Sequence, residues 1–259
     1  MPEIADLAHF ELAPAYYAVL FVVAIFAGFI DAIVGGSGLI TLPALLLCGV
    51  PPHLSLATNK LQSTCGSLTA AVLYFKSRTL PHLFLGCALS AVGAGAGALT
   101  ALLIHAENLK FLILIFLVLT FFYMALRPNL GRERGLPKIK NVKFFHFLVA
   151  FPIGFYDGFL GPGTGSFLIF ACVSLLGYNL KEASINTKFL NFSSNIVALA
   201  TFLILYQALW SLGLLMAAGQ IVGAFFGSKL VLKTQARFIK ALFLVVVGAT
   251  ICKLAWDFF

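Results

Sequence analysis

Charged residues are scarce in this chain, and acidic residues are the scarcest. Only 10% of the 259 residues are charged, 9 are Asp or Glu, and 61% are hydrophobic. A soluble domain carries about 25% charged residues, because much of its surface must face water. A soluble fold of this length could not bury the surplus apolar surface. The composition therefore excludes a soluble globular protein and predicts an integral membrane protein.

Several catalytic and metal-binding patterns are also missing. The chain has no HExxH and no GxSxG, and its GPGTG lacks the Gly-Lys-Ser/Thr that completes a phosphate-binding loop. The five cysteines form no CxxC pair, and no two histidines have the spacing of metal ligands. We therefore expect no enzyme activity, no catalytic residue, no metal and no cofactor.

The net charge of +8 does not indicate a nucleic-acid partner in such a chain. Basic residues of membrane proteins gather in cytoplasmic loops and make the whole sequence basic. The first fourteen residues carry three acids and no Lys or Arg, which is the wrong charge for a cleavable signal peptide. The expected partner is the lipid bilayer, not nucleic acid.

Long apolar segments predict an all-α membrane protein, a polytopic helical bundle. A spanning helix needs roughly 20 apolar residues, so the chain is filled by roughly eight to ten passes. We therefore expect a single transmembrane transporter domain over 1–259. The predicted segments are 15–34, 38–50, 59–75, 81–104, 110–126, 144–160, 165–177, 187–205, 210–228 and 237–256.

The two halves of the chain resemble each other. GFIDAIVGGSGLI from Gly28 matches GFYDGFLGPGTGSFLI from Gly154, and TNKLQS at 58–63 matches NTKFLN at 186–191. The same order of features in both halves predicts two repeats of about five segments each, with the first pair in each half short or re-entrant. The predicted boundaries are repeat 1 at about 14–126, a basic cytoplasmic linker at 127–143 and repeat 2 at about 144–257.

Basic residues also predict the orientation in the membrane. The linker is rich in Lys and Arg with Glu133 as its single acid, and further basic loops begin at Lys76 and Lys229. Such loops are cytoplasmic in most membrane proteins. Counting passes outward from them places both termini in the periplasm and the two halves in opposite orientations. Such inverted repeats are typical of secondary transporters.

Glycine-rich breaks interrupt corresponding segments of both halves. Broken helices leave N–H and C=O groups unpaired, and they are tolerated where they line a polar cavity. Paired breaks are typical of a transporter binding site, and the helix N-termini that follow them suit an anion. The alternative is that the glycines only permit close helix packing. The candidate residues are Gly35, Gly36, Ser37, Gly38, Gly161, Gly163, Thr164 and Gly165.

Asp31 and Asp157 each lie four residues before a break, in otherwise apolar sequence. An intramembrane carboxylate is costly and is a functional candidate by default. Because burial disfavours the charged form, either acid is a candidate carrier of a coupling proton. The alternative is a structural acid that caps freed N–H groups or pairs with a lysine.

Lys60 and Lys188 begin the segments that follow the breaks. A lysine among amides and hydroxyls suits a small oxyanion, and we expect both lysines to contact the substrate. The alternative is that they extend toward the membrane interface, as lysines near helix ends often do. The polar neighbours of the lysines also include Ser63, Thr187 and Ser194, and those predicted to share the site are Thr58, Asn59, Gln62, Asn186, Asn191 and Asn195.

Glycines spaced by four recur late in each half, at Gly93 and Gly97 and at Gly219, Gly223 and Gly227. This pattern lets helix backbones approach closely. The contacts would lie within the chain or between copies, so a homo-oligomer is one arrangement that they allow.

Two long stretches resemble the signatures of a known family. AGFIDAIVGGSGLITLPALLLCGVPPHLSLATNKLQSTCGSLTAA resembles the first signature of the TauE/SafE sulfite exporter family, and GFYDGFLGPGTGSF followed by KFLNFSSNI resembles the second. The likeness covers most of the chain and is greatest to the YfcA-like bacterial branch. It implies a multi-pass permease of the bacterial inner membrane that exports small sulfur-containing anions. Ser37 departs from the family pattern, which often has glycine there.

The sequence therefore predicts a secondary transporter that exports a small anion, with sulfite or an organosulfur or sulfonate compound as the expected class. Protons are the candidate coupling ion. The alternatives are a passive anion channel and a membrane-embedded subunit without transport activity. Saturable flux against a gradient would separate a transporter from a channel.

A reporter fused to the C-terminus is expected to read periplasmic, because the basic loops fix the cytoplasmic side. Paired fusions to alkaline phosphatase and to a fluorescent protein measure this, with a fusion inside the 127–143 linker as the cytoplasmic control. A C-terminal fusion that reads cytoplasmic would contradict the predicted orientation.

Overall fold

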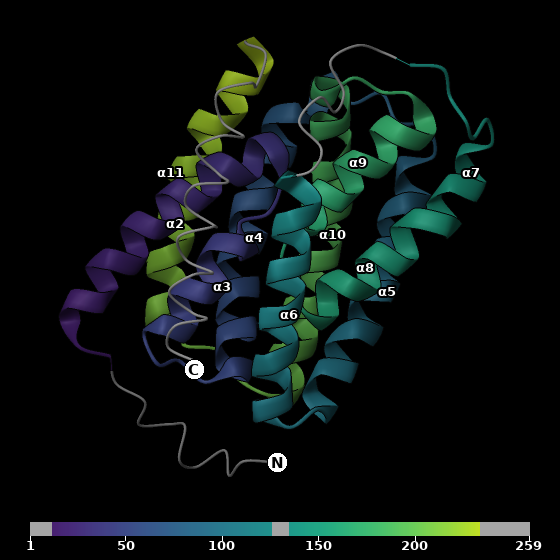
Figure 1. Ribbon diagram of the computed structural model, residues 1–259. Helices are drawn as coiled ribbons and strands as arrows, with labels where there is room; N and C mark the ends of the chain where they lie inside the picture. The colour runs from purple at the N-terminus through teal and green to yellow at the C-terminus, as the bar shows by residue number, and fades with distance from the viewer. Residues whose placement is uncertain (1–11, 126–134, 234–259) are drawn as a thin grey trace.

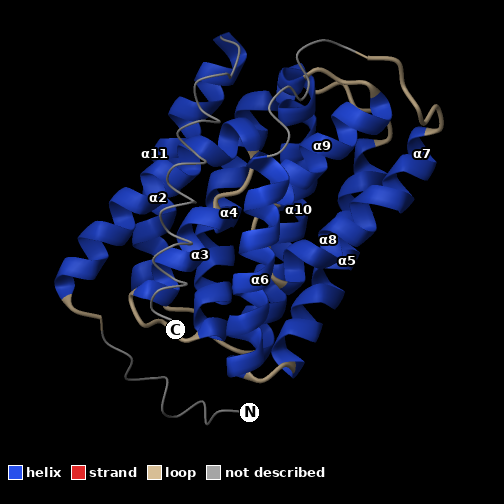
Figure 2. Ribbon diagram, in the orientation of Figure 1, coloured by secondary structure: helices blue, strands red, loops and turns tan. Residues whose placement is uncertain are grey.

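The computed structural model describes residues 12–125 and 135–233 of the chain. All regular structure in these ranges is helical and none of it is strand (Figure 1; Figure 2), which confirms the predicted helical bundle. The helices before the linker are α2 (Pro14–Val34), α3 (Gly38–Leu47), α4 (Pro52–Tyr74), the 3-10 turn η1 (Phe75–Ser77), α5 (Leu83–Leu103) and α6 (Ala106–Ala125). Those after it are α7 (Val142–Phe145), the π-helical turn η2 (His146–Ala150), α8 (Phe151–Phe159), α9 (Thr164–Leu176), α10 (Leu180–Leu205) and α11 (Trp210–Lys233).

Helices of spanning length form the frame of the bundle. Within the described ranges, α2, α5, α10 and α11 are long and apolar enough to cross a membrane. The helices that follow the two breaks are short, with 10 residues in α3 and 13 in α9. The predicted segment 237–256 and both chain ends lie outside the described residues.

The packing of the first half on the second is reciprocal. Helix α2 of the first half packs along α11 of the second half. Helix α8 corresponds to α2 in the repeat, and it packs along α5 of the first half. In the same way α4 contacts α11 while α10 contacts α5, and α4 and α10 contact each other at the centre. Two related halves are expected to make matching contacts of this kind. The inverted repeat itself stays a prediction from the sequence.

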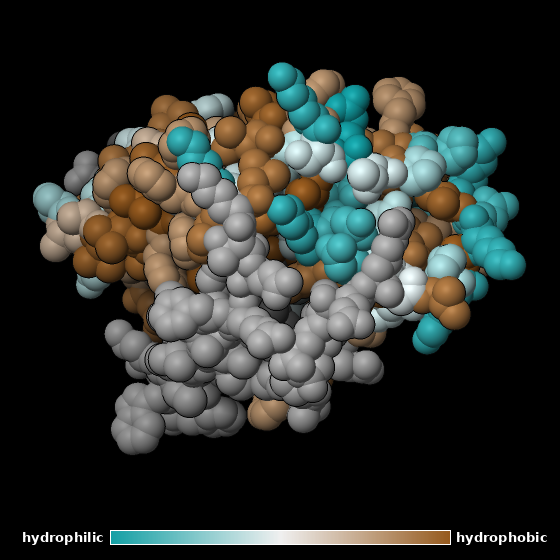
Figure 3. Space-filling model, turned by 90° about the horizontal axis from the view of Figure 1, so that it is seen from above, coloured by the Kyte–Doolittle hydropathy of each residue, from teal (hydrophilic) through white to brown (hydrophobic). Residues whose placement is uncertain are grey.

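The described basic loops lie at one end of the bundle. The backbone N–H of Thr79 donates to Asn186 at the start of α10, and the N–H of Gly135 donates to Gly177 after α9. Helices α8 and α10 begin at this end, whereas α2 and α4 begin at the other (Figure 1). Figure 3 looks onto the same end and shows hydrophilic side chains gathered on it. The exposed basic residues of these loops and helix ends are Lys76, Arg78, Lys138, Lys140, Lys143, Lys181 and Lys229.

Two helices start earlier than predicted. Helices α4 and α10 begin at Pro52 and Leu180 rather than at 59 and 187. Proline fits the first turn of a helix, where its missing N–H costs nothing, and Asn179 closes a capping box with Glu182 at the start of α10. These first turns are polar, so a search for apolar runs passes over them. As a correction, Lys60 and Lys188 lie about two turns inside their helices, not at the start.

Glycine sets the distance between α5 and α8. A Cβ on Gly97 would overlap the backbone carbonyl of Phe155, and one on Gly93 would overlap that of Phe151. The two backbones therefore touch along one side of α5. Gly95, on another face of α5, would place its Cβ 3.4 Å from the Cγ1 atom of Val197, an ordinary contact.

We expect Gly97→Ala to destabilise the protein by about 1–3 kcal/mol, because the added methyl group forces α5 and α8 apart. Gly95→Ala is the matched control on the same helix and should leave stability unchanged or slightly raised, since alanine favours helix. The thermal unfolding midpoint in detergent measures both. Equal midpoints for the two variants would contradict the close contact.

Candidate functional site

The two glycine-rich breaks lie against each other at the centre of the bundle. Gly35 and Gly161 both have positive φ, 75° and 90°, which side chains other than glycine rarely adopt. The hydroxyl of Ser166 donates to the carbonyl of Gly35 across 3.0 Å, and a Cβ on Gly35 would overlap the backbone of Gly165. Each break therefore forms one wall of the space that lies between them.

Hydroxyl groups pair with the carbonyls that the breaks set free. At the end of α2, Tyr74 donates to the carbonyl of Ala32 at 2.9 Å and Ser184 donates to that of Ile33 at 2.6 Å. Unpaired backbone groups would be costly at membrane depth. These contacts therefore hold the first break in place from both halves, because α4 supplies one donor and α10 the other.

The second break uses donors of its own. Tyr156 donates to the carbonyl of Pro162 at 2.6 Å, and the hydroxyl of Thr164 donates to the carbonyl of Gly161 at 2.9 Å. Helix α9 starts directly after these contacts, so its N-terminus points into the space between the breaks. A helix N-terminus carries a partial positive charge that favours an anion.

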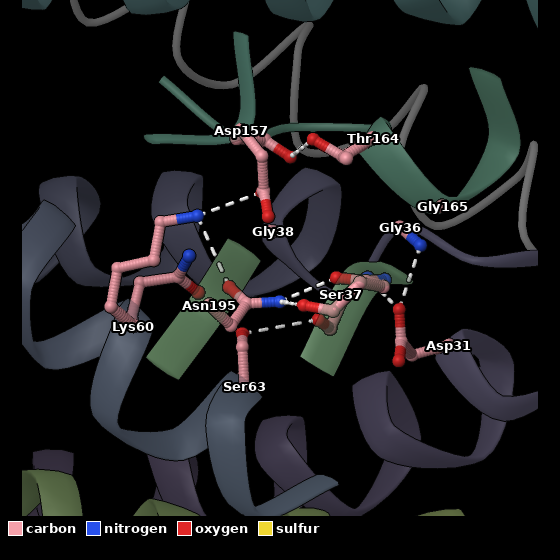
Figure 4. A pocket seen from close by; sticks show the side chains of 13 residues that line it. Asp31, Gly36, Ser37, Gly38, Lys60, Ser63, Asp157, Thr164, Gly165 and Asn195 are labelled. Atoms are coloured by element: carbon pink, nitrogen blue, oxygen red, sulfur yellow. Dashed lines mark hydrogen bonds and ion pairs between the residues drawn. The ribbon is translucent and has the colours of Figure 1, made fainter. Parts of the chain in front are cut away.

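A small polar cavity lies between the breaks (Figure 4). Its free space holds on the order of one water molecule, so the site is closed around its own side chains. Charged groups, amides and hydroxyls supply the polar lining, and glycines supply the rest. The lining residues are Asp31, Gly36, Ser37, Gly38, Asn59, Lys60, Ser63, Asp157, Gly161, Thr164, Gly165, Asn191 and Asn195.

Two ion pairs cross between the halves. The Nζ atom of Lys60 lies 2.7 Å from Oδ1 of Asp157, and the Nζ atom of Lys188 lies 2.8 Å from Oδ2 of Asp31. The four residues are 0–4% exposed. Their charges sum to zero, which is the condition under which charges persist in a medium of low polarity.

Asp31 also caps the first break. Its Oδ1 atom accepts hydrogen bonds from the backbone N–H groups of Gly36 at 2.9 Å and Ser37 at 3.2 Å. The carboxylate thereby satisfies donors that the interrupted helix leaves free, while its other oxygen binds Lys188. Both structural roles weighed for this acid, the cap and the lysine partner, are present together.

Lys60 and Asp157 meet a network of side chains from α10. The ammonium of Lys60 donates to Oδ1 of Asn195 at 3.1 Å, and Ser194 donates to Oδ2 of Asp157. The amide nitrogen of Asn195 donates in turn to Asn191. Figure 4 shows the lysine nitrogen between the Asp157 carboxylate and the Asn195 amide oxygen.

Some predicted residues lie outside the cavity. The hydroxyl of Thr58 accepts from the N–H of Leu209, and Gln62 donates to the Asn59 side chain. Asn186 binds the backbone before α5 and so orders a loop at the bundle end. Gly35, Gly163 and Lys188 lie beside the cavity rather than on its wall.

The structure also revises two readings of the sequence. The lysines do not extend toward the interface, because Lys60 is 1% and Lys188 0% exposed. Ser63, a polar neighbour of Lys60 in the sequence that is not in the predicted set of site residues, lines the cavity and bonds to Ser37 through the two hydroxyls, 3.3 Å apart. The repeat could have identified it, because TNKLQS and NTKFLN place Ser63 opposite Asn191.

Known proteins are similar in sequence to this chain over almost its full length. The family described as "Sulfite exporter TauE/SafE" matches residues 20–254. The chain is 41% identical over 249 residues to the probable membrane transporter protein ORF9 of Sinorhizobium sp, with 95% of each chain covered. It is 39% identical over 251 residues to the probable membrane transporter protein YfcA of Escherichia coli strain K12, covering 96% of this chain and 93% of the relative.

A third relative, a probable membrane transporter protein of Haemophilus influenzae, is 40% identical over 243 residues, with 93% of this chain and 94% of the relative covered. No solved structure matches the chain. The family match and these relatives agree with the multi-pass helical bundle. We conclude that the chain belongs to the TauE/SafE sulfite exporter family of membrane transporters.

Proposed function

We propose that this protein is a secondary transporter that exports a small anion, of the sulfite or sulfonate class, across the bacterial inner membrane by alternating access. The observation that carries the proposal is the buried meeting of two broken helices around crossed Lys–Asp pairs. The family description supplies the sulfite class. Intramembrane ionisable residues at such breaks mark substrate and ion pathways in transporters.

The chemistry of the cavity suits an oxyanion. Lys60 offers a positive charge, Ser37 and Ser63 offer hydroxyl donors, and the α9 N-terminus offers backbone N–H groups. In the structure, the carboxylate of Asp157 occupies the position beside Lys60 that a bound anion would take. A carboxylate and a sulfonate present similar acceptor oxygens to an ammonium group. The free space is small, which favours a compact anion.

Closure of the site favours a transporter over a passive channel. The charged residues on the cavity wall, Asp31, Lys60 and Asp157, are 1–4% exposed. A pore that conducts passively needs a continuous wet path past such residues. A closed polar site is instead what an occluded state of an alternating-access cycle presents, with exposure to each side in turn.

In proteoliposomes, we expect saturable flux of at least one anion from a panel of sulfite, sulfoacetate and methanesulfonate, and accumulation of that anion when a pH gradient is imposed. The physical reason is that charge enters this neutral site only with a compensating charge. Uptake of radiolabelled anions measures it, with protein-free liposomes as the control. Flux that never exceeds equilibration would indicate the channel, and no flux across the panel would contradict the proposed substrate class.

A further inference from the structure

The two ion pairs are held differently, although the sequences that supply them repeat. Asp31 accepts two backbone N–H groups, from Gly36 and Ser37, besides the ammonium of Lys188. Asp157 accepts from side chains, the ammonium of Lys60 and the hydroxyl of Ser194. A carboxylate bonded to the backbone is fixed by the fold, whereas one bonded to side chains is released by rotamer changes.

The sequence contains the reason for this difference. Alignment of Asp31 with Asp157 places Pro162 at the position of Gly36. Proline has no backbone N–H, so the second break lacks the first donor that the other carboxylate receives. The carbonyl of Pro162 is bound by Tyr156, which stabilises this break from its other side. The second break is therefore held without the help of Asp157.

The two lysines also differ in their position relative to the cavity. Lys60 lines the cavity and lies against its open space, with Asp157 and Asn195 as partners. Lys188 is fully buried and does not line the cavity. Figure 4 shows Asp31 turned toward the backbone of the first break, on the other side of the cavity from the Lys60 ammonium. An anion entering the cavity therefore meets Lys60 rather than Lys188.

We propose that Lys60 and Asp157 form the exchangeable pair of the transport cycle, and that Asp31 and Lys188 form a fixed structural pair. The substrate anion replaces the Asp157 carboxylate as the partner of Lys60, and the displaced carboxylate takes up one proton on an oxygen atom. This inference rests on the proposed function and assigns its proton coupling to Asp157.

The charges balance for a monovalent anion. Before exchange the pair carries one positive and one negative charge. Afterwards the ammonium pairs with the anion, the carboxyl group is neutral, and the buried site again has no net charge. Anion and proton thus move together, and net flux follows the product of their gradients. Export proceeds when the outward gradient of the anion exceeds the inward gradient of protons.

Among residues 12–125 and 135–233, few other charged or titratable groups face Asp157. Lys60 on α4 is its partner, Asp31 lies across the cavity, and Lys188 on α10 is bound to Asp31. Tyr156, its neighbour on α8, is engaged with a backbone carbonyl. Helix α5, which packs along α8, presents glycine and alanine to it. The proton exchange is therefore assigned to Asp157 without a competing acid on the packed helices.

The test compares Asp157→Asn with Asp31→Asn in proteoliposomes, using methanesulfonate, whose sulfonate does not become neutral and so cannot leak across as an acid. One proton per anion gives wild-type accumulation of about tenfold per pH unit on the alkaline side. Asp157→Asn should lose this accumulation while still exchanging labelled for unlabelled anion at equal pH. Asp31→Asn should lower exchange and accumulation together and lower the thermal midpoint, because it loosens the first break, whereas the control Gly95→Ala on α5 should keep both activities. Should the wild type move another panel anion better, that anion is the probe.

If Asp157→Asn accumulated the anion, or if Asp31→Asn lost accumulation while still exchanging the anion, the assignment of the proton to Asp157 would be overturned. The proposed transport function would not be affected by either result. Absence of any wild-type flux would instead contradict the proposed function.

A second measurement does not depend on the variants. Wild-type protein in weakly buffered detergent should take up one proton for each anion bound, and binding without proton uptake would also overturn the inference.

Discussion

Among the described residues, each half buries one lysine and one aspartate, and each of these charges is paired with a residue of the other half. An unpaired buried charge costs several kcal/mol, so the halves dock in the one register that joins Lys60 to Asp157 and Lys188 to Asp31. The rest of the centre follows from that register. It places the two breaks against each other, and it places the hydroxyls of α4 and α10 on the carbonyls that α2 sets free.

The reciprocal packing has a mechanical consequence. Helix α2 is joined to α11 and α8 to α5 through glycine contacts that leave little freedom for sliding. Each of these tight units combines a broken helix of one half with a spanning helix of the other. The more polar helices α4 and α10 lie between them and supply five of the thirteen residues that line the cavity. In the proposed transport cycle, access to the cavity changes by a movement of these units about α4 and α10.

Much of this arrangement could be predicted from the sequence, because the signals are strong. Composition requires a membrane, and two matching glycine-rich breaks in an apolar chain identify the cavity. The pairing of the charges could not be predicted, since the lysine follows the aspartate at a similar distance in each half, 29 residues in the first and 31 in the second, and only the fold selects the crossed combination. The true start of α4 was also missed, because hydrophobicity reports burial in lipid whereas this helix buries polar groups against protein.

The crossed pairs also constrain how the chain is made. During synthesis, Asp31 and Lys60 enter the membrane long before Lys188 and Asp157 leave the ribosome. For that interval the partners that Asp31 and Lys60 have in the folded protein do not yet exist. The first half therefore reaches its final ion pairing only when the second half arrives. A chain cut short at the linker lacks both partners and forms neither ion pair.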